Sequence, residues 1–66
     1  MKLLIDPFTN KPKEFAEYAP DGYKAMRTLF VNGKTDIELK PFIVLEVEYN
    51  ASLLDKTYDP ETNTLI

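Results

Sequence analysis

The sequence predicts a small α+β domain, an antiparallel sheet of three to four strands with one helix. Three observations lead to this prediction. The 66 residues suffice for one domain, residues 1–66, and not for two. A hydrophobic content of 44% is that of a folded chain. Short alternating apolar runs are separated by turn residues, as in a small sheet. The alternative is an all-β fold, if 24–39 is an Asn-Gly hairpin.

The N-terminal part begins with an apolar run at 2–5, which predicts a first strand that Asp6-Pro7 ends. Three of the five prolines then fall between residues 7 and 20. Proline lacks an amide donor and restricts the residue before it. We therefore expect 6–20 to be a proline-rich loop or arm, with room for one helical turn at 13–19.

The segment 21–34 has two interpretations, a helix and a strand, and we favour the helix. As a helix, it has Asp21 as N-cap and Gly33 just past its end, in a left-handed cap. Ala, Met, Lys and Arg favour this interpretation, whereas Thr28, Phe30 and Val31 favour a strand.

As a strand, the same segment runs from Lys24 to Val31 into Asn32-Gly33, a strong hairpin signal. The return strand would be 34–39, with Arg27 opposite Glu38. One face of this hairpin would be apolar, formed by Met26, Phe30, Ile37 and Leu39.

The C-terminal part contains the clearest strand, 42–49, which is apolar at its start and alternates at its end. Ile43, Leu45, Val47 and Tyr49 would share one face. Residues 50–55 predict a single helical turn capped by Asn50. Residues 57–58 and 64–66 flank a turn at 59–63 and could form a terminal hairpin.

Catalytic and metal-binding chemistry is not supported by the residue types present. The chain has no cysteine and no histidine, so the usual proton shuttles, thiol nucleophiles and zinc ligands are missing. Its two glycines cannot form a phosphate-binding loop. We therefore expect no enzyme activity, no cofactor and no metal.

Charge also restricts the partners. The net charge of −3 has the wrong sign for nucleic-acid binding, and no run reaches the ~20 apolar residues of a membrane span. Residues 1–35 hold six basic and four acidic side chains (+2), whereas 36–66 hold two basic and seven acidic ones (−5). We expect these halves to pair within one molecule, with head-to-tail pairing between copies as the alternative.

Two groups of side chains are candidates for contact with a partner protein. Phe8, Phe15 and Tyr18 lie in the proline-rich segment, where exposed aromatic rings need a cover. Glu46 and Glu48 alternate on one strand, and could form an acidic docking face together with Asp36 and Glu38 if those strands pair.

These features predict a non-enzymatic protein, an assembly or interaction subunit that binds itself or a heterologous chain. A domain of this size buries only ~60% of its unfolded surface. Without disulfides or a metal, it gains stability by very good packing or by oligomerisation, and we favour a homo-oligomer. By analogy in size and in the lack of catalytic residues, and not on any motif, we expect a phage or mobile-element accessory or structural protein. The alternative function is a small acidic regulatory module that docks on a basic surface. We expect a cytoplasmic or virion-associated protein.

Overall fold

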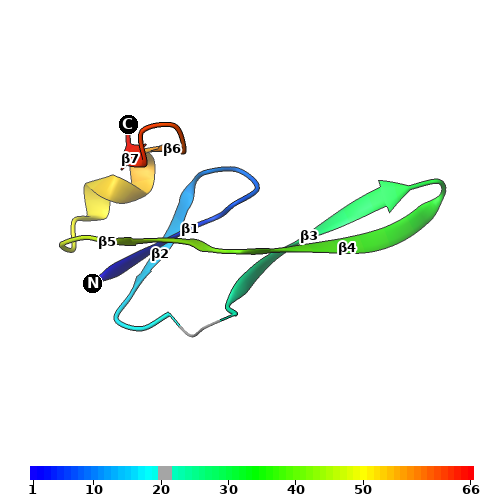
Figure 1. The fold of residues 1–66 in the computed structure, drawn as a ribbon, viewed down its shortest axis with the longest axis horizontal. Helices are drawn as coiled ribbons and strands as arrows, with labels where there is room; N and C mark the ends of the chain where they lie inside the picture. Colours follow the sequence, from blue (N-terminus) through cyan, green and yellow to red (C-terminus); the bar gives the residue numbers. More distant parts are fainter. Residues whose placement is uncertain (20–21) are drawn as a thin grey trace.

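A computed structural model describes residues 1–19 and 22–66 (Figure 1). In chain order its elements are β1 (Lys2–Ile5), β2 (Pro12–Ala16), β3 (Lys24–Val31), β4 (Lys34–Pro41), β5 (Ile43–Glu46), the 3₁₀ helix η1 (Ala51–Asp55), β6 (Tyr58–Asp59) and β7 (Thr64–Leu65). The described residues form antiparallel sheets with one 3₁₀ turn and no longer helix, so the fold is all-β. The α+β prediction is wrong, and its all-β alternative is correct.

The central sheet has the strand order β2-β1-β5, and both pairings are antiparallel. Leu3 of β1 lies opposite Phe15 on one side and Leu45 on the other. Residues directly opposite each other share a face of a sheet, so these three side chains point to the same side. A bulge in the β1–β2 register follows Leu4.

The core lies on that face of the sheet. Leu3 and Ile5 are fully buried and pack with Tyr58, which comes from the C-terminal hairpin β6–β7. The core is completed by half-buried side chains from other elements: Phe15, Ile43, Leu45, Val47, Leu53 and Leu65. The expected alternation of the 42–49 segment is therefore confirmed for Ile43, Leu45 and Val47.

The segment predicted as a helix is a strand of a long hairpin. β3 and β4 pair over their whole length, from Lys24 opposite Pro41 to Val31 opposite Lys34. Asn32 (φ 53°) and Gly33 (φ 76°) both have positive φ, as a two-residue type I′ turn requires. Local helix propensity was nearly balanced by strand propensity, and eight cross-strand pairs decide for the strand. The proposed cap at residue 21 lies outside the described residues.

Within the proline-rich segment, residues 12–16 form strand β2 and not the helical turn expected at 13–19. Pro12 is the first residue of β2, where proline is tolerated, and β2 is an edge strand of the sheet. In this strand the Phe15 side chain packs against the core. An isolated helical turn would not bury it in this way.

In the C-terminal part, the strand predicted at 42–49 is shorter, Ile43–Glu46, and Tyr49 lies beyond it, whereas the capped turn and the terminal hairpin form as predicted. Asn50 caps η1, and its side chain accepts a hydrogen bond from the Ser52 amide at 3.0 Å. The terminal hairpin forms, with Tyr58 opposite Leu65. Among the described residues, no helix is both long and apolar enough to cross a bilayer.

We expect Leu3→Ala to destabilise the fold by about 2–5 kcal/mol, because the cavity would lie at the centre of the only core cluster in the described residues. Urea unfolding followed by circular dichroism measures the change. The exposed Leu54→Ala is the matched control and should change stability by less than about 1 kcal/mol. Equal losses in both variants would show that the core lies elsewhere.

Candidate interaction surface

The β3–β4 hairpin, residues 24–41, projects from the rest of the molecule as an arm (Figure 1). We call the remaining described residues, 1–19, 22–23 and 42–66, the body. The molecule measures 43 × 25 × 20 Å, and its radius of gyration is 13.4 Å. A compact chain of this length would have a radius of gyration of about 11 Å. The arm accounts for this elongation, because it is paired only with itself at its outer end.

The arm joins the body at the pair Tyr23 and Phe42, which flank its first and last residues. Their rings stack, with centroids 4.7 Å apart and planes inclined by 23°. The Phe42 amide also donates a hydrogen bond to the Tyr23 carbonyl at 3.3 Å. These contacts hold the two ends of the hairpin together where they leave the body.

One face of the arm is apolar and exposed. The register places four apolar side chains on it, Met26, Phe30, Ile37 and Leu39. All four are at least half exposed, and Phe30 is 77% exposed. Thr28 and Thr35 lie between them, and the only charged residue on this face is Lys24, at the base. We call this surface the apolar face.

The opposite face carries the arm's other charges. Arg27 lies opposite Glu38, as the hairpin register predicted, and its Nη2 is 2.7 Å from the Glu38 carboxylate. The Arg27 Nε donates to the same carboxylate oxygen at 3.0 Å. Lys34, Asp36 and Lys40 share this face by register. We call it the charged face.

Phe8 of the β1–β2 loop packs against the charged face. The Arg27 guanidinium carbon lies 4.7 Å from the centroid of the Phe8 ring, and the Lys40 ammonium lies 5.3 Å from it. Both distances are within the range of a cation–π contact. The ring therefore holds the base of the arm through its charged side.

The loop that carries Phe8 is well braced. The Asp6 carboxylate accepts the Phe8 amide at 2.8 Å, and the Asp6 amide donates to the Lys11 carbonyl at 2.9 Å. The Tyr58 amide donates to the Asn10 carbonyl at 2.8 Å, which ties the loop to the C-terminal hairpin. Because the body meets the arm through Phe8 on the charged face, the apolar face is left turned away from this contact.

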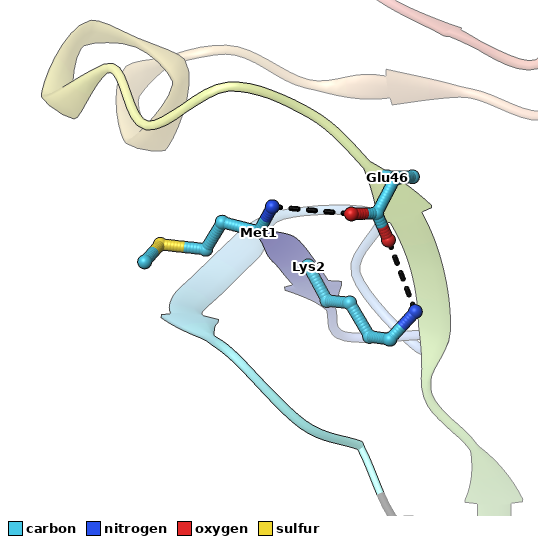
Figure 2. A network of polar contacts seen from close by, with 3 residues as sticks. All are labelled: Met1, Lys2 and Glu46. Atoms are coloured by element: carbon cyan, nitrogen blue, oxygen red, sulfur yellow. Dashed lines mark hydrogen bonds and ion pairs between the residues drawn. The ribbon is translucent and has the colours of Figure 1, made fainter.

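A second polar cluster fixes the N-terminus (Figure 2). The Met1 amine lies 3.1 Å from one carboxylate oxygen of Glu46, and the Lys2 ammonium lies 3.0 Å from the other. The pKa of Glu46 is lowered below its ordinary value by two hydrogen bonds. The bond from Lys2 has the larger effect, and the bond from the N-terminal amine has the next largest. This carboxylate therefore joins β5 to the start of β1.

The sequence-predicted contact residues have different environments. Phe8 and Phe15 are half-buried in their own chain, and the Phe15 ring lies 4.8 Å from that of Tyr49. Tyr18 is 74% exposed. Glu46 is paired as described above, and Glu48 is exposed. The structure brings none of the three aromatic residues onto the apolar face.

The expected acidic face with four carboxylates does not assemble, because β4 pairs with β3 and β5 pairs with β1. Asp36 and Glu38 lie on the arm, whereas Glu46 and Glu48 lie on the body. The opposed charges of the two halves do meet within one molecule, through Arg27–Glu38 and Lys2–Glu46.

Sequence reasoning identified the apolar set of the arm as one face of a possible hairpin but did not nominate it as a contact surface. The signal was present in the alternating runs on both sides of Asn32-Gly33. The helix interpretation concealed it, because these four residues share a face only when 24–31 pairs with 34–41 as a hairpin.

The described residues offer little for other chemistry. A hollow of about 280 Å³ lies beside Lys2, Tyr23 and Phe42. It is at the small end of ligand pockets, and its only charged lining residue, Lys2, is already paired with Glu46. No three His, Cys, Asp or Glu side chains among the described residues gather closely enough to hold a metal ion.

No protein-family model, curated protein or solved structure matches the chain.

We expect Phe8→Ala to loosen the arm from the body, because it removes the ring that contacts Arg27 and Lys40. Each lost contact is worth about 0.5–1 kcal/mol. Residual dipolar couplings should fit one alignment tensor for arm and body in the wild type and two in the variant. Tyr18→Ala, which removes an exposed ring, should keep one tensor. A single tensor for Phe8→Ala would contradict the bracing role.

We expect Glu46→Gln to reduce the melting temperature at neutral pH and to reduce its dependence on acid pH. The pKa of Glu46 is lowered by folding, so its contribution to stability is complete above the ordinary glutamate pKa of about 4.3. That contribution is lost as the pH falls through the lower pKa of the folded state. Melting curves of the two proteins should therefore converge at acid pH.

The control for this experiment is Glu48→Gln, since Glu48 is exposed and forms no ion pair with any residue between 1 and 19 or 22 and 66. Its melting temperature should follow that of the wild type at every pH. A constant difference between wild type and Glu46→Gln down to the lowest pH would contradict the ion-pair explanation.

Proposed function

We propose that this chain acts by protein–protein association, as an assembly or interaction subunit, and that the apolar face of the β3–β4 arm is its contact surface. The observation that carries the proposal is the exposure of Met26, Phe30, Ile37 and Leu39 on one side of a projecting hairpin. A two-stranded hairpin in water is marginally stable on its own. A partner on the apolar face would remove the exposed surface and stabilise the arm.

The exposed area of the whole chain supports this proposal. The accessible surface is 4875 Å². The size scaling of monomeric proteins gives about 4,300 Å² for 7.6 kDa. The chain therefore exposes on the order of 600 Å² more than a compact monomer. The excess is of the size that one partner of a small specific interface buries.

The composition of the apolar face also supports binding to protein. Phenylalanine, methionine and branched aliphatic residues lie side by side, flanked by threonines, and the only charge on this face is Lys24 at its base. Interface cores have this character, because aromatic residues and methionine are enriched there and charged residues are depleted. Nucleic acid would instead require a basic surface.

The acidic regulatory module has weaker support than association through the arm. Its basis was a continuous acidic face, and the carboxylates concerned lie apart on arm and body. Glu46, one of these carboxylates, is already paired with the Met1 amine and with Lys2. The proposal of a cytoplasmic or virion-associated protein continues to rest on the sequence alone.

The test compares Phe30→Lys with Val31→Lys in cells that express the chain natively. Phe30 and Val31 are adjacent, both exposed and on opposite faces of one strand. Chemical cross-linking should join the wild type and Val31→Lys to other polypeptides through arm residues. It should yield about 30-fold fewer such products from Phe30→Lys, as expected when a large aromatic residue of the interface is lost. Equal products from all three chains would exclude the apolar face as the contact surface.

A further inference from the structure

We infer that the occupant of the apolar face is a second copy of this chain, so that two arms pack face to face in a two-fold dimer. This inference rests on the proposed function and adds the identity of the partner. A two-fold interface requires a patch that is complementary to itself. The apolar face meets this requirement along its length, because no charge lies on it between Met26 and the turn.

The area available is sufficient for such a dimer. Each chain exposes on the order of 600 Å² more than a compact monomer of its mass. Two copies that each buried this excess would bury about 1,200 Å² in total, which is the lower limit for stable specific interfaces. We therefore expect a dimer with a dissociation constant in the micromolar range.

The single charge on the face selects the relative direction of the two arms. If the arms ran parallel, both Lys24 side chains would lie at the same end of the interface. If they run antiparallel, the two ammonium groups lie at opposite ends, and each faces the turn of the partner arm. Like charges brought together across an interface are unfavourable, so the antiparallel arrangement is the stable one. It also places the two bodies at opposite ends of the dimer.

The register of the hairpin fixes which residues meet. Successive levels of the face, from base to tip, are the pairs Lys24–Pro41, Met26–Leu39, Thr28–Ile37 and Phe30–Thr35. The apolar residues are centred on the Thr28–Ile37 level. A two-fold axis at this level brings Ile37 close to Ile37 of the other copy. It also places Phe30 of each arm over Met26 of the other.

The first measurement is the mass of the purified protein across the micromolar range by sedimentation equilibrium. We expect a monomer–dimer equilibrium for the wild type and for Val31→Lys. We expect the dissociation constant of Phe30→Lys to rise about 30-fold or more. Because Phe30 is 77% exposed, its replacement should leave the body folded, which the amide spectrum of β1 checks. A monomeric wild type throughout this range overturns the inference.

The second measurement locates the contact by cross-linking. The chain has no cysteine, so a single introduced thiol reports its own position. A short bismaleimide should link two Ile37→Cys chains efficiently and two Val31→Cys chains poorly. In a mixture of Met26→Cys and Phe30→Cys, mixed products should exceed either self-linked product. Equal linking at 31 and 37 overturns the face-to-face dimer, and dominant self-linking at 26 and 30 overturns the antiparallel direction.

These outcomes separate the inference from the proposed function. If the purified protein is monomeric while cross-linking in cells still depends on Phe30 and not on Val31, the second copy is the wrong occupant and the arm is still a contact surface. If cross-linking in cells is also independent of Phe30, both the inference and the proposed function fail.

Discussion

The burial of β1 between β2 and β5 is the constraint on which the rest of the structure depends. Leu3 and Ile5 on this strand are the fully buried members of the core, and both neighbouring strands pair with it directly. The arm lies in the sequence between these two neighbours, since β2 leads to β3 and β4 leads into β5. Fixing β2 and β5 on either side of β1 therefore fixes where both ends of the arm leave the body. A chain of this length has residues for one such core and few to cover anything else.

The contact between Phe8 and the arm shows how this limited core determines the exposed surface. The body holds the arm partly through the Phe8 ring, which lies under two cations of the charged face, and Ala25 on the same face is buried. A cation–π contact still contributes about 0.5–1 kcal/mol at an exposed site, so it can act at the rim of a small protein. The consequence is an arm whose charged face contacts its own body and whose four large apolar side chains on the other face stay at least half exposed. In this protein, the packing of one half-buried ring leaves the larger apolar surface available to a partner.

The ion pairs between the two halves of the chain help to align neighbouring strands. The two halves of the sequence carry opposite net charge, and the ion pairs Arg27–Glu38 and Lys2–Glu46 join them within one molecule. Both pairs are at least partly exposed, so each adds little to the free energy of unfolding. Their effect is on register: one aligns β3 with β4, and the other aligns the start of β1 with the end of β5.

The sequence by itself determined the local elements. The strand at 2–5, the alternation of Ile43, Leu45 and Val47, the Asn50 cap and the terminal hairpin could all be predicted, because each depends on residues close together in the chain. It also identified the apolar set Met26, Phe30, Ile37 and Leu39, but only under its second interpretation. Tertiary structure decided between helix and hairpin at 24–31, since the local propensities nearly cancel and the pairing with 34–41 breaks the balance. It also decided that Phe8 faces inward and that the acidic residues separate, because both depend on which strands become neighbours, and single-residue preferences do not encode that choice.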